Sequence, residues 1–232
     1  MKTVSRAKDI IWQKKPFTIN PTEQGNRKMH FGNSLWIGIL GFLSTEDDAS
    51  PGNFGLWDQI LAIKWVKRNI AAFGGDPNDI TIAGESAGGA SVSILSISPV
   101  SKNLFTKVYS HSGFATSLFA DYKNPMSDVI TLSKKLGCYQ SSSSSQDIIE
   151  CLRNKPAASL IAELDLYKTS YVPRVDGELL PKLPMNLLTT QLEKLHRGST
   201  QELSSFCLLD LLYIRLRKDN LQKPFLIGLK TY

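Results

Sequence analysis

The feature that most constrains this chain is a Gly-x-Ser-x-Gly pattern placed between two recognisable elements. It reads Gly84-Glu85-Ser86-Ala87-Gly88. The β-branched stretch Ile80–Ala83 before it predicts a short strand, and the small-residue stretch Ala87–Ile97 after it predicts a helix closed by Pro99. The pattern alone arises by chance in about one chain in ten of this length at average composition. Its position between a strand and a helix makes it far more specific.

A sharp turn from strand to helix leaves the hydroxyl of Ser86 exposed at the N-terminus of the helix. We expect glycine at Gly84 and Gly88 because side chains there would clash in so tight a turn, and we expect Gly89 to allow close helix packing. The helix dipole and the free N–H groups of the first turn favour the oxyanion of an acyl-transfer intermediate, which makes the Ala87 N–H the candidate oxyanion donor. The alternative is a serine that only caps a helix.

Alternating helices and strands around this pattern predict an α/β fold with a mostly parallel sheet flanked by helices. The apolar run Leu35–Leu43 predicts a buried strand with its exit turn. Apolar residues at helical spacing over Gly55–Phe73 predict an amphipathic helix that Gly74 stops, and Lys107–Ser110 predicts a second strand. Helical patterns recur at Ile148–Leu152 and Ala157–Leu164, and the serine run Ser141–Ser145 is expected to be an exposed loop tip.

Composition excludes several classes of protein. With 232 residues, 42% of them hydrophobic, one domain with a buried core is the default expectation. No apolar run is long enough to span a membrane, and the first twenty residues lack a signal-peptide pattern. The net charge of +6 comes from scattered Lys and Arg without interleaved aromatic residues, so we expect no nucleic-acid partner. We also predict no metal site and no cofactor.

Two of the three cysteines bracket a short polar stretch. Cys138 and Cys151 flank residues 139–150, and the residues alone leave two interpretations open: a disulfide formed in an oxidising compartment, or two buried thiols. Cys207 lies in an apolar stretch and is expected to serve packing.

Four blocks of sequence resemble the type-B carboxylesterases, the group that includes the cholinesterases. They are Gly38–Thr45, Gly52–Gln59, Asn69–Pro77 and Gly84–Gly89. The resemblance covers Gly38 to about Leu188 and resumes in Lys223–Gly228. It divides the chain into an unmatched, irregular leader (1–34), a carboxylesterase-like core (35–188), an unmatched segment (189–222) that could hold a helix pair, and a truncated returning core strand (223–232).

The resemblance implies an incomplete α/β-hydrolase fold and hydrolysis of a small-molecule carboxylic ester through an acyl-enzyme on Ser86, with a Ser-His-Glu/Asp triad. Glu85 resembles the acidic neighbour of the nucleophile that assists the active-site hydrogen-bond network, and Ser112 resembles the family's buried second serine. Cys138 and Cys151 fall where the family forms a disulfide. That pairing implies maturation in the secretory pathway.

The chain also departs from the family pattern. Residues 1–34 contain no His-Gly-Gly segment, which supplies further oxyanion donors in relatives. The family acid follows the strand matched by Leu226–Gly228, and the catalytic histidine lies further downstream. His30, His111 and His196 match neither place, so we expect little or no esterase activity from this chain alone. The alternatives are a non-catalytic binding or adhesion module and a truncated product that does not fold; the sequence indicates no oligomeric state.

Overall fold

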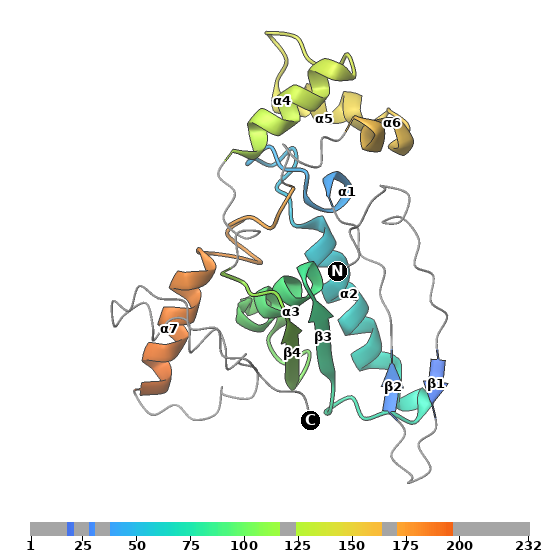
Figure 1. Ribbon diagram of the computed structural model, residues 1–232, viewed down its shortest axis with the longest axis vertical. Coiled ribbons are helices and arrows are strands. Elements are labelled where there is room, and N and C mark those ends of the chain that lie inside the picture. Colours follow the sequence, from blue (N-terminus) through green and yellow to red (C-terminus); the bar gives the residue numbers. More distant parts are fainter. Residues whose placement is uncertain (1–17, 21–27, 31–37, 117–123, 164–170, 197–232) are drawn as a thin grey trace.

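The computed structural model describes residues 18–20, 28–30, 38–116, 124–163 and 171–196. Two strands, β3 (Thr81–Glu85) and β4 (Lys107–His111), run parallel and pair in register along their whole length. Helix α3 (Ala87–Ile97) connects them and packs on one face of the pair (Figure 1). This β–α–β unit confirms the predicted strand, elbow, helix and second strand. It also confirms the α/β class.

Residues of the two strands alternate between the face under α3 and the opposite face. On the α3 side, Ile82 is buried in the main hydrophobic cluster. Also on this side, the hydroxyl of Ser110 donates to the Gly89 carbonyl at 3.0 Å. The opposite face therefore carries Thr81, Ala83, Glu85, Lys107, Tyr109 and His111, which are all exposed.

Helix α2 (Phe54–Asn69) continues as the 3-10 turn η2 (Ile70–Phe73). It stops at Gly74, whose φ of 83° lies in the left-handed region that glycine adopts freely. The predicted amphipathic helix and its glycine stop are confirmed.

The apolar residues of α2 do not all share one face. Leu56 and Ile60 are completely buried in the main cluster, whereas Leu61 and Trp65 are 58% and 47% exposed. Each exposed residue follows a buried one by five positions, and five residues rotate about 140° beyond a full helical turn. For this reason Leu61 and Trp65 lie off the buried face of α2, although both belong to the apolar residues of the predicted helix.

The predicted strand Leu35–Leu43 is also wrong over its described part. Ile39–Phe42 forms a single helical turn, α1, that begins after Gly38. Gly38 has a φ of 64°, and its carbonyl accepts from the Phe42 N–H at 2.9 Å, which closes the helical turn. An apolar run of this length has no period that separates a strand from a buried helical turn.

A second hydrophobic cluster lies away from the sheet, where α4 (Pro125–Lys135), α5 (Ser145–Arg153) and α6 (Ala157–Ala162) gather (Figure 1). The disulfide Cys138–Cys151 joins the segment after α4 to α5 and confirms the pairing that the resemblance implied. α5 and α6 confirm the predicted helices, whereas α4 was not predicted. The cluster consists of Ile39, Val129, Leu132, Cys138, Ile148, Ile149 and Leu152.

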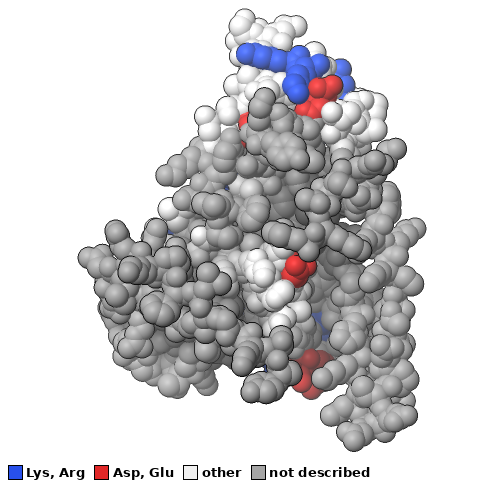
Figure 2. Space-filling view, viewed as in Figure 1, with Lys and Arg blue, Asp and Glu red and all other residues white. Residues whose placement is uncertain are grey.

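Opposite charges lie next to each other over this helical region (Figure 2). Lys135 pairs with Glu163 at 3.5 Å, and both side chains are more than two-fifths exposed. Lys134 lies over the ring of Tyr139, 4.9 Å from its centre. Exposed pairs of this kind stabilise a fold only slightly.

A buried polar joint connects two segments that are about 120 positions apart in the chain. Asn53 is completely buried with a left-handed φ of 59°. Its amide donates to the Arg174 carbonyl at 2.7 Å and to Asp176 Oδ2 at 2.8 Å, and its Oδ1 accepts from the Arg174 N–H at 2.8 Å. Asp176 Oδ1 in turn accepts from the Leu180 N–H at 2.9 Å. The joint fixes the start of α2 against the segment that supplies Leu180 to the main cluster.

The two ends of the chain differ in part from expectation. In the leader, β1 (Thr18–Asn20) and β2 (Lys28–His30) pair antiparallel, so these six residues are not irregular. Helix α7 (Pro184–His196) crosses the expected boundary between residues 188 and 189, and its Leu188 is buried in the main cluster. The expected strand within 223–232 and Cys207 lie outside the described residues.

Candidate active site

Ser86 occupies a strained turn between β3 and α3. Its φ is 56° and its ψ is −118°, a combination rarely adopted by residues other than glycine. The Ser86 N–H donates to the His111 carbonyl at 2.8 Å, and the Ser86 carbonyl accepts from the Ala90 N–H at 3.0 Å. Both bonds hold the backbone in place while the residue itself stays exposed. The predicted geometry of the elbow is present.

Three glycines let the backbones approach closely at this turn. A Cβ atom added at Gly84 would lie 2.2 Å from the Gly88 carbonyl oxygen, and one at Gly89 would lie 2.7 Å from the His111 carbonyl oxygen. A Cβ at Gly113 would lie 2.0 Å from the Ser86 carbonyl oxygen. These distances support the expectations for Gly84 and Gly89.

The roles of Gly88 and Gly113 differ from those expected from the sequence. A Cβ added at Gly88 would meet no atom within 4 Å, so the prediction that a side chain there would clash was wrong. Gly88 lies on the open side of the first turn of α3. Gly113 was missed because it lies beyond the next strand, outside the motif, and approaches the Ser86 carbonyl only when the two strands pair. The available signal was a glycine just beyond the predicted strand Lys107–Ser110.

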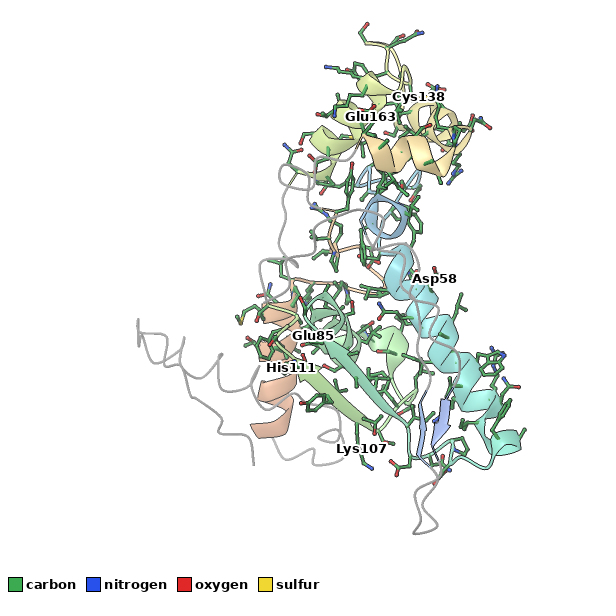
Figure 3. The ribbon with its side chains drawn as sticks, turned by 45° about the vertical axis from the view of Figure 1, so that its right-hand side comes forward. Asp58, Glu85, Lys107, His111, Cys138 and Glu163 are labelled. Atoms are coloured by element: carbon green, nitrogen blue, oxygen red, sulfur yellow. A yellow bond between two sulfur atoms is a disulfide. The ribbon has the colours of Figure 1, made fainter. Side chains whose placement is uncertain are left out.

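The carboxyl ends of the two strands bring Glu85 and His111 side by side. The two residues are opposite each other in the register, on the face away from α3, and Figure 3 shows both at the same end of the sheet. A shallow open hollow of about 360 Å³ lies on this face. Its lining residues are Ala83, Gly84, Glu85, Tyr109 and His111.

The remaining predicted site residues are placed as follows. Ala87 is the first residue of α3, and N–H groups of the first turn have no partner within their own helix. Ser112 is exposed, with a φ of 53°, so the burial that the resemblance implied for it is wrong.

His111 is the one histidine whose side chain the structure describes, and that side chain forms no hydrogen bond with the Ser86 hydroxyl. His111 reaches the elbow through its backbone carbonyl. His30 ends β2 and His196 ends α7, and neither strand β2 nor helix α7 contributes to the hollow. The described part of the chain also contains no cluster of three or more potential metal ligands. No helix within the described ranges has the length and apolarity needed to cross a bilayer.

Comparison with known proteins gives the family. A sequence model of the Carboxylesterase family matches residues 36–223, and the match therefore runs through the segment 189–222 that the sequence analysis left unmatched. Mouse bile salt-activated lipase is 46% identical over 159 residues, which cover 65% of this chain and 26% of that protein.

The chain is also similar to a second hydrolase and to a neuroligin. Rat carboxylesterase 1C is 43% identical over 154 residues (66% of this chain, 28% of that protein). Human neuroligin-2 is 41% identical over 155 residues (66% of this chain, 18% of that protein). The chain spans about a quarter of the length of the lipase and the carboxylesterase. The match over residues 36–223, together with the β3–elbow–α3–β4 unit, shows that the chain belongs to the carboxylesterase family and has part of an α/β-hydrolase fold.

Proposed function

We propose that this chain is the nucleophile-bearing part of a serine hydrolase that acts on small-molecule carboxylic esters. The observation that carries the proposal is the geometry of Ser86: an exposed hydroxyl residue at φ 56°, between a strand and the first residue of a helix. This backbone conformation is costly for serine, and such cost is typical of functional residues. A serine that only capped α3 would accept a hydrogen bond from the first turn, and Ser86 makes no side-chain cap.

In the proposed reaction, Ser86 Oγ attacks the ester carbonyl carbon and loses its proton to a general base. The negative charge that develops on the carbonyl oxygen is stabilised by the Ala87 N–H and the N-terminal end of α3. The intermediate collapses, and the alcohol leaves with a proton. Water then attacks the acyl group on Ser86 and releases the carboxylic acid.

We expect this polypeptide on its own to hydrolyse esters only slowly. A serine hydroxyl is a weak nucleophile without a base in hydrogen-bond reach, and none of the side chains that the structure describes is hydrogen-bonded to Ser86 Oγ. Enzymes of this class that lack triad members keep only residual activity, which comes from the oxyanion donors and from substrate binding. The Cys138–Cys151 disulfide favours maturation in the oxidising secretory pathway.

A non-catalytic binding or adhesion module is the second candidate. It is favoured by the 41% identity to neuroligin-2, a relative whose name is not that of a hydrolase. The strained serine elbow argues against it, because a binding surface does not require this backbone conformation.

Covalent labelling with a fluorophosphonate probe tests the proposal. The probe phosphonylates Ser86 Oγ with loss of fluoride. We expect slow labelling, as for a serine with residual reactivity, that Ser86→Ala abolishes and that the matched surface variant Ser142→Ala leaves unchanged. Folded wild-type protein, verified by circular dichroism, that remains unlabelled would refute the hydrolase proposal and favour the binding module.

A further inference from the structure

Helix α2 exposes apolar side chains on the face opposite its buried face. Phe54, Leu61 and Trp65 are exposed, whereas Leu56 and Ile60 are completely buried in the main cluster. A surface helix ordinarily presents polar residues on the side away from the core. Contiguous apolar residues on an exposed face are typical of an interface with another molecule.

The exposed residues of this face recur at alternating steps of four and three positions. We call them the α2 stripe; its members, all of them exposed, are Phe54, Asp58, Leu61, Trp65 and Arg68. Steps of four and three keep residues on one face of a helix, and this is the spacing by which one helix packs against a second. Figure 3 shows Asp58 on the side of α2 that faces away from α3 and the two strands.

The indole of Trp65 is in contact with a second exposed aromatic ring. The ring centres of Trp65 and Phe73 are 6.3 Å apart, and the two rings are tilted by 46°. Phe73 is also exposed, so it widens the apolar part of the stripe. Tryptophan and arginine, both present here, are enriched among the residues that contribute most to the affinity of protein interfaces.

The two charges of the stripe are arranged symmetrically about its apolar centre. Asp58 lies three positions before Leu61, and Arg68 lies three positions after Trp65. Arg68 Nε donates to the Lys64 carbonyl of its own helix at 3.2 Å, and neither Asp58 nor Arg68 forms an ion pair within the described part of the chain.

This arrangement complements its own twofold image. In an antiparallel pair of α2 helices, with the twofold axis midway between Leu61 and Trp65, these two residues lie opposite each other. The same axis places Asp58 of each copy opposite Arg68 of the other. A parallel pair would instead place like charges opposite each other, which is unfavourable.

We propose that the α2 stripe is a self-association surface, on which a second copy of this chain docks through its own α2 in the antiparallel orientation. Charge complementarity identifies the occupant, because the stripe offers its copy an opposite charge at both ends and an apolar contact between them. A single pair of helices buries an area at the lower end of specific interfaces, about 1,200 Å² or less in total. We therefore expect a reversible dimer with a Kd of about 10 to 100 μM.

Sedimentation velocity of the oxidised full chain, at protein concentrations that bracket this Kd, tests the inference. Arg68→Asp and Asp58→Arg each place like charges opposite each other twice in the dimer, so each should raise the Kd about tenfold or more. The double variant restores opposite charges and should return the Kd to within about threefold of the wild-type value. The matched control is Arg153→Asp, which changes an exposed arginine in the last turn of α5 and should leave the Kd unchanged.

Two further comparisons use the same measurement. The Asp58→Arg and Arg68→Asp chains should associate with each other when mixed, because one stripe then carries two positive charges and the other two negative charges. Leu61→Ser and Trp65→Ser remove the apolar contact and should also weaken the dimer. Circular dichroism and urea unfolding verify that each variant is folded.

Four results would overturn the inference. They are a wild-type chain that remains monomeric, a Kd that does not respond to the single charge changes, a double variant that remains as weak as the single variants, and association that Arg153→Asp weakens equally. A monomeric wild type that binds vesicles of phosphatidylcholine and phosphatidylserine, with binding that Trp65→Ser abolishes, would replace the second copy by a membrane surface as the occupant of the stripe.

Discussion

Replacing Asn53 by alanine should destabilise this protein more than any surface change of the same type. Three side-chain hydrogen bonds of 2.7 to 2.8 Å to Arg174 and Asp176 are lost. A hydrogen bond contributes about 1 kcal/mol net, and the partners in the buried joint would lose their bonds. Alanine also has to adopt the left-handed φ of 59°, which costs about another 1 kcal/mol. Together these effects predict a loss of about 4 kcal/mol in the free energy of unfolding.

Two matched variants separate the contributions. Asn53→Gly accepts the left-handed backbone but loses the same bonds, so it should cost about 1 kcal/mol less than Asn53→Ala. Asn103 also has a left-handed backbone, with φ 64°, but it is exposed and none of the side-chain hydrogen bonds described here involves it. Asn103→Ala should therefore cost only about 1 kcal/mol.

Urea unfolding followed by circular dichroism gives these free energies. If Asn53→Ala and Asn103→Ala reduce the free energy of unfolding equally, the hydrogen bonds of the joint contribute nothing and the reasoning is refuted. A large loss for Asn53→Ala that Asn53→Gly fully restores would show that only the backbone conformation matters, which would also contradict it.

Three further outcomes are expected. Gly113→Ala should lower the urea midpoint and slow probe labelling, because its Cβ would lie 2.0 Å from the carbonyl oxygen of the elbow serine, whereas Gly88→Ala should leave the midpoint unchanged or raise it, since that position is open. Replacing Cys138 and Cys151 together by serine should reduce the free energy of unfolding by about 3 kcal/mol, measured against the oxidised protein, because the bridge closes a loop of 13 residues. Ser144 caps α5, and its hydroxyl and N–H groups donate hydrogen bonds to the Asp147 carboxylate, which lowers the pKa of that carboxyl below 3.8. The contribution of these bonds to the free energy of unfolding should therefore be complete above about pH 4 and be lost as the pH falls through the folded pKa. The urea midpoint of Asp147→Asn should accordingly approach that of wild type below pH 4, and a difference that grew there would contradict this sign.

The β–α–β unit was predictable because its determinants are local. A β-branched stretch, two glycines around a serine and a run of small residues each favour one conformation, and they agree with one another along Ile80–Ile97. Local patterns also predicted α2, α5 and α6. The disulfide pairing was implied by the family resemblance, whereas the spacing of the cysteines alone left it open.

Features that depend on distant contacts were not predictable in the same way. The single turn α1 replaced an expected strand because the conformation of Gly38 and the burial of Ile39 against the second cluster decided between them. Gly113 is required by the Ser86 carbonyl, which approaches it only after the two strands pair. Asn53 occurs in a block quoted for family resemblance, yet its partners lie 121 and 123 positions away. A linear sequence without homologues contains no sign of such a pairing.

The division of the apolar interior into two clusters has a consequence for how the chain opens. Tyr171 is the one described hydrophobic side chain that packs against both clusters, and the disulfide lies entirely within the cluster formed by α4 and α5. Sub-global opening should therefore separate the molecule at this tyrosine, with the amide protons of α4 and α5 exchanging with solvent as one cooperative unit and those of α3 as another. Reduction of the disulfide would speed exchange in α4 and α5 and leave α3, which begins directly after Ser86, nearly unaffected.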